Sequence, residues 1–300
     1  MITRKLKAAA ALAVGAALAL TGCAADAGSG GQAEQRPIKI AVFNGWDESV
    51  ANSYLWKAIL ESKGYQVELE EADVAAVYAG LSGGDYDLTL DTWLPLTHKQ
   101  YIEKFGDDIV DMGVWNDEAK LTIAVNANAP IDSLEDLAAN AGQFGNKLVG
   151  IEAGSGLVAV TQEDVIPGYG LEGMEFTTSS TPAMLAELDT AMNSGENIAV
   201  TLWRPHWAYD AYDLKDLKDP KGLLGETEQL HSYASSSFEN DFPEVAAWIR
   251  EFKMSSELLY SLEAAMFREG DGKDHEQTVA AWIAENQEYV DSLTAGSATP

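Results

Sequence analysis

From Ile38 onward, short apolar runs alternate with stretches in which apolar residues recur at helical spacing. The first pattern predicts β-strands and the second predicts α-helices. The first helix is expected to begin at Asp47 and to end before Gly64, which is a natural helix stop. This order of strand, helix and strand is typical of a parallel sheet covered by helices. The strands predicted in this first part of the chain lie at 38–44, 66–72 and 86–93.

The same alternation resumes after residue 120 and changes near Leu223. Beyond that point, one short apolar stretch at 230–236 precedes three helical segments. The strands predicted before the change lie at 120–126, 147–153, 174–180 and 198–203. The helical segments predicted after it lie at 242–252, 255–267 and 275–293.

These patterns predict an α/β protein of two lobes, with a chain that crosses between the lobes more than once. The region after the N-terminal segments is long enough for two lobes. We expect the C-terminal helices to return and pack on the first lobe. The predicted boundaries are 37–123 plus 223–293 for lobe I, 124–222 for lobe II and 294–300 for a tail.

The N-terminus has the features of a bacterial lipoprotein signal. Basic residues precede an apolar run of about thirteen residues, which has signal-peptide length and is too short to span a bilayer comfortably. The run ends in small residues before Cys23. We therefore predict a signal peptide over 1–22, a lipid on Cys23 and a flexible polar tether over 23–36. An ordinary secretory signal with an incidental cysteine is the alternative.

Composition and charge exclude several classes of function. The net charge of −29 argues against binding nucleic acid or an anionic lipid surface. Cys23 is the only cysteine, so the chain forms neither an internal disulfide nor a thiolate metal cluster. The sequence lacks the common phosphate-binding, hydrolase and metalloprotease motifs, and its four histidines lack metal-ligand spacing. We therefore expect no cofactor, no metal and no enzymatic activity.

Three tryptophans fall at or just past the ends of predicted strands: Trp46, Trp93 and Trp203. Open α/β sheets bind their ligands at the carboxyl edge of the strands, where these side chains would meet. Local core packing is the alternative for each tryptophan taken singly, but it does not explain the convergence of all three. The pattern therefore predicts a ligand cage.

An aromatic cage favours a cation, because indole faces attract positive charge. A quaternary ammonium suits it best, since this group has no N–H to donate to a carboxylate. The stretch 150–158 adds an anion site, because a strand runs there into a glycine-rich turn and a helix start. Free N–H groups at Gly156 and Leu157 would bind a carboxylate, and His98 would donate a further hydrogen bond. Together these features indicate a ligand with a cation at one end and a carboxylate at the other.

The residues 38–293 resemble the glycine betaine-binding lipoproteins of ABC transporters. The resemblance rests on five motifs in consistent order: WDES, TWLPLTHK, GIEAGSG, TLWRPHW and YDLKDLKDPKG. It implies a type II periplasmic-binding-protein fold, in which two α/β lobes close on a ligand in the cleft between them. It also implies a monomer that passes its ligand to a permease with a cytoplasmic ATPase, from the extracellular face of the plasma membrane.

Carried over motif by motif, the resemblance places the trimethylammonium cage on three residues: Trp46, Trp93 and Trp203. It places the contacts to the ligand's carboxylate on His98 and on the backbone amides of Gly156 and Leu157. The first two tryptophans and His98 would belong to lobe I and the others to lobe II. Binding would therefore require both lobes and would be coupled to closure.

Several alternatives remain open at the level of the sequence. Other ligands of the same class are proline betaine, carnitine, choline, ectoine and dimethylsulfoniopropionate. Choline lacks a carboxylate and would leave His98 and the glycine-rich turn unused. A different class is an extracellular enzyme that acts on a polysaccharide through tryptophan stacking and a carboxylate pair. A surface receptor or adhesin without a transport role is the third.

Overall fold

The computed structural model describes residues 36–269 and 274–297. The described residues belong to one compact unit that begins at Arg36. The predicted signal peptide, the lipid-bearing Cys23 and nearly all of the predicted tether lie outside the described residues. No helix within the described ranges is long and apolar enough to cross a membrane.

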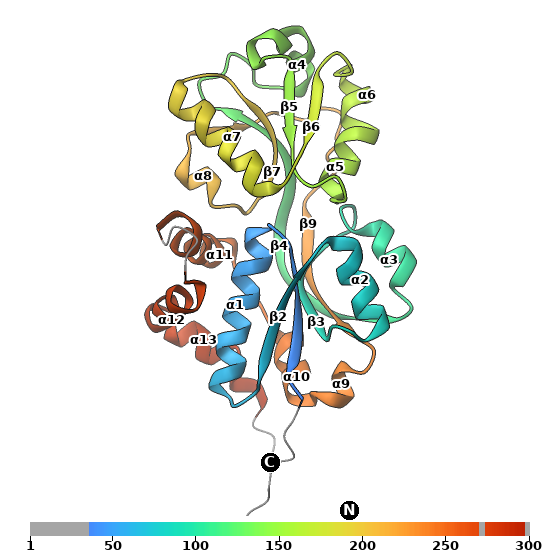
Figure 1. Cartoon of the computed structure of the whole chain (residues 1–300), viewed down its shortest axis with the longest axis vertical. Helices are drawn as coiled ribbons and strands as arrows, with labels where there is room; N and C mark the ends of the chain where they lie inside the picture. Colours follow the sequence, from blue (N-terminus) through green and yellow to red (C-terminus); the bar gives the residue numbers. More distant parts are fainter. Residues whose placement is uncertain (1–35, 270–273, 298–300) are drawn as a thin grey trace, which may run out of the picture. The chain divides into compact units, whose positions relative to one another are not determined.

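The strands form two sheets that share one long strand, β4 (Ile109–Asn126). The first sheet has the order β2-β1-β3-β9-β4, and its β1 pairs in parallel with β2 and β3. It forms the lower lobe in Figure 1. The strands that join β4 in this sheet are β1 (Ile38–Phe43), β2 (Val67–Ala72), β3 (Leu88–Leu94) and β9 (Glu228–Ser235).

The second sheet continues from the other end of β4 with the order β4-β7-β5-β6. Strand β7 is antiparallel to β4 and parallel to β5, so the direction of the strands changes between β4 and β7. The short strand β8 (Leu214–Asp216) also pairs with β4. The remaining strands of this upper lobe are β5 (Lys147–Gly150), β6 (Glu175–Thr178) and β7 (Ala199–Arg204).

Helices lie around each sheet, and their sequence positions agree with the alternation of apolar patterns. Those of the lower lobe are α1 (Asp47–Ser62), α2 (Val74–Gly83), α3 (Lys99–Phe105), α9 (Phe238–Asp241), α10 (Pro243–Glu251), α11 (Ser256–Glu263), α12 (His275–Glu285) and α13 (Gln287–Ser292). Those of the upper lobe are α4 (Leu134–Asn140), α5 (Gly156–Val160), α6 (Ile166–Tyr169), α7 (Thr181–Ser194) and α8 (Ala208–Ala211).

Short helical segments complete this set. A π-helical turn, Thr161–Val165, joins α5 to α6, so that the chain is helical from Gly156 to Tyr169. A second π-helical segment extends α11 from Ala264 to Glu269. Two 3-10 turns follow α4 and α13, at Ala141–Phe144 and Ala295–Ser297.

The structure differs from the sequence-based expectation in three places. The sheet of the lower lobe is not wholly parallel, because β9 lies antiparallel between β3 and β4. The strand expected at 120–126 is the second half of β4, which begins at Ile109 and runs through both sheets. The helix expected at 275–293 is interrupted at Asn286, where α12 ends and α13 begins. The C-terminal helices do return to the first lobe, where α11 and α12 pack against α1.

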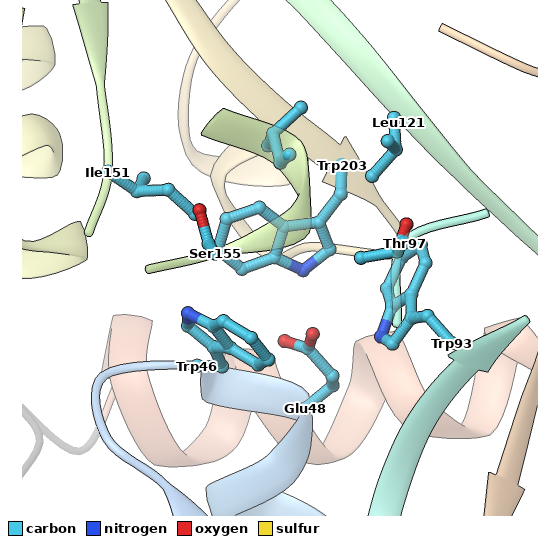
Figure 2. Close-up of a pocket in the computed structure, with 9 residues that line it drawn as sticks. Trp46, Glu48, Trp93, Thr97, Leu121, Ile151, Ser155 and Trp203 are labelled. Atoms are coloured by element: carbon cyan, nitrogen blue, oxygen red, sulfur yellow. The ribbon is translucent and has the colours of Figure 1, made fainter. Parts of the chain in front are cut away.

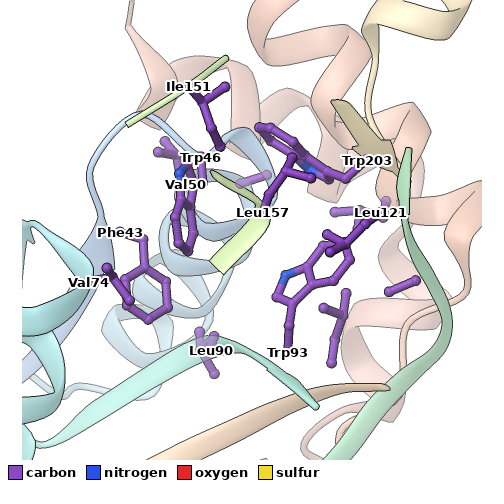
Figure 3. Close-up of a cluster of buried hydrophobic side chains, with 14 of the residues drawn as sticks. Phe43, Trp46, Val50, Val74, Leu90, Trp93, Leu121, Ile151, Leu157 and Trp203 are labelled. Atoms are coloured by element: carbon purple, nitrogen blue, oxygen red, sulfur yellow. The ribbon is translucent and has the colours of Figure 1, made fainter. Parts of the chain in front are cut away.

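The buried core extends from both lobes toward the place where they meet. Figure 3 shows Phe43, Val74 and Leu90 of the lower lobe beside Trp46 and Trp93. The upper lobe contributes other members of the same buried cluster: Ile151, Leu157 and Trp203. The strand-end tryptophans are therefore continuous with the core on one side, which holds their rings in place.

Candidate functional site

A narrow cavity lies where the two lobes meet. Figure 2 shows the indole rings of Trp46, Trp93 and Trp203 and the carboxyl group of Glu48 around it. Residues from both lobes form the wall: Trp46, Glu48, Trp93, Thr97, Leu121, Ile151, Ser155, Leu157 and Trp203. The three tryptophans predicted to converge therefore border one cavity.

Each tryptophan of the cavity reaches it from a different strand. Trp46 follows β1 and immediately precedes α1, Trp93 lies near the end of β3, and Trp203 lies near the end of β7. The exposed fractions of these residues are 7%, 3% and 3%, so the rings are almost closed off from solvent. Burial strengthens the attraction between an indole face and a cation, to about 2 kcal/mol or more per contact. The cavity is therefore suited to a small cation.

Two of the three indoles are oriented by hydrogen bonds at their edges. The Trp93 Nε1–H donates to Asp91 Oδ1 over 2.9 Å. The Trp46 Nε1–H donates over 3.2 Å to Glu152 Oε2, which comes from the upper lobe. The Glu152 carboxylate also accepts hydrogen bonds from the backbone N–H and the side-chain hydroxyl of Thr181. These bonds engage the edges of the rings and not their faces, and the faces are the part of an indole that attracts a cation.

His98 lies behind the cavity wall, where it is fully buried and stacks on Trp46 with ring centroids 5.4 Å apart. Its Nδ1 accepts a hydrogen bond from the Trp93 backbone N–H over 2.9 Å. Burial lowers the pKa of the imidazole to about 3, so the ring is neutral near neutral pH. The neutral ring must then carry its proton on Nε2, which has no partner among the described residues. His98 thus holds one unused N–H donor beside Trp46.

The predicted anion turn begins helix α5 on the upper lobe. Ser155 caps this helix, and its hydroxyl accepts a hydrogen bond from the Val158 N–H over 3.2 Å. Gly156 and Leu157 are the first two residues of the helix, so their N–H groups have no acceptor inside it. Leu157 and Ser155 line the cavity. The helical segment therefore presents donor groups where the two lobes meet.

Gly156 packs directly against the backbone of Thr97 on the opposite lobe. A Cβ atom at this position would lie 2.0 Å from the Thr97 carbonyl oxygen, a distance that no real side chain tolerates. Only glycine therefore allows the upper-lobe turn to come this close to the lower lobe. Gly156 is not part of the cavity wall, but Thr97 and Leu157 beside it are.

The lower-lobe loop that carries Thr97 is held by a buried carboxylate. Glu228, at the start of β9, accepts hydrogen bonds from the backbone N–H groups of Leu96 and Thr97, over 2.8 and 2.9 Å. It also accepts a hydrogen bond from the Thr97 hydroxyl. Glu228 is 1% exposed, so this anchor is shielded from water. The antiparallel insertion of β9 therefore positions the loop between Trp93 and His98.

Sequence reasoning missed Thr97, Leu121, Ile151 and Ser155 in the cavity wall, and also the one charged residue among its described members, Glu48. Figure 2 shows its carboxyl group directed into the space between the three indoles. The sequence did contain a signal, because Glu48 follows Trp46 by two positions in the WDES motif. Acidic residues in the first turn of a helix are also favoured by the helix dipole. The helix dipole therefore accounts for Asp47 and Glu48 in the sequence, and nothing in the sequence indicates that the Glu48 side chain points into the cavity.

Trp207, the last residue of the TLWRPHW motif, connects the lobes on another side. Its Nε1–H donates to Asp47 Oδ2, at the start of α1. Its backbone N–H donates over 2.9 Å to Glu263 Oε2, at the end of α11. These contacts join the segment after β7 to two helices of the lower lobe. They add to the hydrogen bond from Trp46 to Glu152, which also joins the two sides of the cavity.

Comparison with known proteins places this chain in a family. Residues 36–285 match the family described as the substrate binding domain of ABC-type glycine betaine transport systems. The glycine betaine/carnitine transport binding protein GbuC of Listeria monocytogenes is 34% identical over 170 residues. That alignment covers 56% of this chain and 54% of the relative, so it spans about half the length of that protein.

Two solved structures have the same fold over nearly their whole length. Lactococcal OpuAC, in its closed conformation complexed with glycine betaine, is 28% identical with a TM-score of 0.80. The comparison covers 87% of this chain and 100% of that one. The glycine betaine, L-proline-binding protein ProX of Borrelia burgdorferi is 30% identical with a TM-score of 0.80, over 86% and 96% of the two chains. The predicted fold class, a two-lobed α/β binding protein, is confirmed.

Proposed function

Because the chain belongs to the family of substrate-binding domains of ABC-type glycine betaine transport systems, we propose that it captures glycine betaine and delivers it to an ABC permease. The family consists of transporter substrate-binding proteins and not of enzymes. The alternative of a polysaccharide-degrading enzyme is therefore wrong. Substrate-binding proteins of ABC importers act outside the cytoplasmic membrane. The lipid on Cys23, the monomeric state and the identity of the ligand are parts of the proposal.

The observation that carries the proposal is the convergence of Trp46, Trp93 and Trp203 on one buried cavity. Three ring faces that surround a trimethylammonium group replace its water shell with attractive quadrupoles. A sugar would also stack on indoles, but it would require polar partners for each hydroxyl group. The wall of this cavity is mostly apolar, with Glu48 as its one charged residue among those described. A compact methylated cation fits this environment.

The ligand's carboxylate is assigned to the N–H donors beside the cage. The proposed donors are the backbone amides of Gly156 and Leu157 and the Nε2–H of His98, whose Nε2 lacks a protein partner. A hydrogen bond to a charged acceptor contributes more than one between neutral groups. The amides belong to the upper lobe and His98 to the lower lobe. A bound zwitterion would therefore stabilise the closed arrangement of the two lobes.

Carnitine and proline betaine would present the same two ends and are the nearest alternatives. The name of the relative from Listeria monocytogenes includes carnitine, which supports testing that ligand first. Choline has the cation without the carboxylate and would leave the three N–H donors unused. We therefore rank choline and ectoine behind the betaines.

Calorimetric titration of the purified protein and its His98→Ala variant tests this assignment. The wild-type protein should bind glycine betaine, while glycine and acetate should give no measurable binding. His98→Ala should weaken glycine betaine binding about 10- to 150-fold, because loss of a hydrogen bond to a charged group costs about 1.5–3 kcal/mol. The binding of choline should be almost unaffected by this change, since choline has no carboxylate.

The matched control is His275→Ala, on helix α12 and outside the cavity wall. It should leave the affinity for glycine betaine unchanged. Equal binding of glycine and glycine betaine by the wild-type protein would refute the proposed function. An equal loss of affinity for glycine betaine and choline in His98→Ala would instead make His98 a structural residue.

A further inference from the structure

Four carboxyl groups gather beneath the tryptophan cage, and the cage alone does not explain them. We call Asp47, Glu48, Asp91 and Glu263 the carboxyl cluster. Glu48 is 2% exposed, while Asp91 and Glu263 are fully buried. The Asp47 side chain is 14% exposed. Carboxyl groups are rarely buried to this extent without a cationic partner, because desolvation strongly disfavours their charged form.

The cluster has unused hydrogen-bonding capacity, and one member faces the cavity. Oxygen atoms Glu48 Oε2, Asp91 Oδ2 and Glu263 Oε1 are buried and have no partner among the described residues. Glu48 lines the cavity, and its carboxyl group lies between the three indoles in Figure 2. A buried carboxyl group that is directed into a cavity, with one oxygen atom that lacks a partner, indicates a ligand that supplies the missing partner.

The groups around the cluster supply no positive charge. Among the described residues, no lysine or arginine forms an ion pair with Glu48, Asp91 or Glu263. The Nε2 of His206, which follows β7, lies 3.8 Å from Asp47 Oδ2. Burial lowers the pKa of His206 to about 3, so this imidazole is neutral near neutral pH. His98, on the other side of Trp46, is neutral for the same reason.

The remaining charged neighbours are acidic and act on the cluster from the upper lobe. The charge of Glu152, which follows β5, raises the pKa of Asp47. The charge of Asp210, on α8, raises the pKa of Glu263. The indole N–H of Trp207 opposes this effect in part, because it donates a hydrogen bond to Asp47. The surroundings therefore disfavour negative charge on the cluster.

Burial is the main cause of a raised pKa for every member of the cluster. It raises the pKa of Asp47 to about 7 and the pKa values of Glu48, Asp91 and Glu263 well above their usual range. The charge of Asp91 raises the pKa of Glu48 further. The charge of Glu263 likewise raises the pKa of Asp91. The ligand-free cluster therefore keeps its protons to a higher pH than exposed carboxyl groups do.

We propose that the carboxyl cluster releases a proton when a quaternary ammonium ligand enters the cage, with Glu48 as the group that faces the cation. The O–H bond of one carboxyl group breaks, the proton passes to solvent, and the resulting carboxylate balances the charge of the ligand. No covalent bond forms. This inference rests on the proposed function and adds a determinant of specificity to it.

The exchange follows from the chemistry of the ligand. A quaternary ammonium has no proton to give up, so it cannot enter an apolar cavity in a neutral form. Opposite charges attract strongly where water is excluded, which favours ionisation of the nearest carboxyl group. An uncharged molecule of the same shape cannot stabilise that carboxylate. The cluster therefore favours cations over neutral ligands that would fill the cage equally well.

The sign of the pH dependence follows from the same exchange. The complex holds fewer protons than the free protein, so affinity for the ligand rises with pH. The rise approaches about tenfold per pH unit for each proton released and stops above the pKa of the free carboxyl group. His98 would have the opposite effect, because a bound carboxylate favours its protonated form and causes proton uptake. The direction of exchange therefore distinguishes the cluster from His98.

Calorimetry of glycine betaine binding in buffers with different enthalpies of ionisation measures the exchange directly. At about pH 7, the observed binding enthalpy should vary linearly with the buffer's ionisation enthalpy, with a slope that corresponds to release of about one proton. Glycine betaine has no group that titrates in this range, so the proton must come from the protein. The purified full chain is used throughout, and the affinity is measured over a range of pH.

Two variants locate the proton. Glu48→Gln should reduce the release and flatten the pH dependence of affinity. Asp91→Asn should also change the pH dependence, because it removes a titratable neighbour of Glu48 while keeping an oxygen acceptor for the Trp93 indole. Glu172→Gln changes an exposed glutamate of the upper lobe by the same charge and should leave the release unchanged.

The outcomes separate this inference from the proposed function. Absence of any glycine betaine binding would refute the proposed function, and this inference with it. Tight binding with no proton exchange, or with proton uptake, would overturn only the inference. Wild-type release that persists unchanged in both Glu48→Gln and Asp91→Asn would also overturn it.

Discussion

Replacement of Trp93 with alanine is expected to weaken glycine betaine binding about 30- to 1,000-fold, a loss of about 2–4 kcal/mol. The Trp93 ring is 3% exposed and lines the cavity between the lobes. Its removal eliminates one desolvated contact with the cation and admits water to the site. Calorimetric titration of the variant measures the loss.

Trp93→Phe separates the role of the ring face from that of side-chain volume. Phenylalanine retains an aromatic face, so this variant should lose clearly less affinity than Trp93→Ala. Thermal unfolding of both variants without ligand serves as the control for folding. If Trp93→Phe is as damaging as Trp93→Ala while both remain folded, Trp93 acts through packing and the cation–π explanation is wrong.

Gly156→Ala is expected to reduce glycine betaine affinity by about 100-fold or more, because overpacking at such a contact costs about 3 kcal/mol. The added Cβ would lie 2.0 Å from the Thr97 carbonyl oxygen on the opposite lobe. This contact joins the two lobes, so the ligand-free protein should fold normally and fail only to close. Affinity is measured by calorimetry and folding by thermal unfolding.

Gly142→Ala provides the matched control for this prediction. Gly142 lies in the 3-10 turn after α4, and a Cβ atom there would meet no other atom within 4 Å. This variant should bind glycine betaine like the wild-type protein. If Gly156→Ala binds equally well, the close approach to Thr97 is not required for binding.

The sequence was sufficient to predict the features that depend on local pattern. The spacing of apolar residues located most strands and helices, because each element that buries one face repeats its apolar residues at a characteristic interval. The convergence of Trp46, Trp93 and Trp203 also followed from local information. Each residue lies near the carboxyl end of a strand. In open α/β sheets, the carboxyl ends of parallel strands lie at the same edge of the sheet.

Features that depend on contacts between distant segments could not be predicted in this way. The placement of β9 between β3 and β4 results from pairing across more than a hundred residues, such as Trp93 with Leu230. The need for glycine at 156 results from the approach of the Thr97 carbonyl, which belongs to the opposite lobe. No local pattern contains either contact.

The carboxyl cluster was missed for a related reason. Asp47 and Glu48 stand in the first turn of a helix, where acidic residues are common because of the helix dipole. Asp91 lies in β3 and Glu263 lies at the end of α11, so only the folded chain brings them near Glu48. Their burial contradicts the usual tendency of charged residues to remain exposed.

The central claim is that the cage recognises the positive charge of its ligand. Competitive titration with glycine betaine and tert-butylacetate tests it most directly, because the two molecules have nearly the same shape and carboxylate and differ in the charge of the central atom. We predict that tert-butylacetate binds at least about 100-fold more weakly, since it loses the cation–π contacts of Trp46, Trp93 and Trp203 and leaves Glu48 without a counter-charge. Equal affinity for the two molecules would contradict the account.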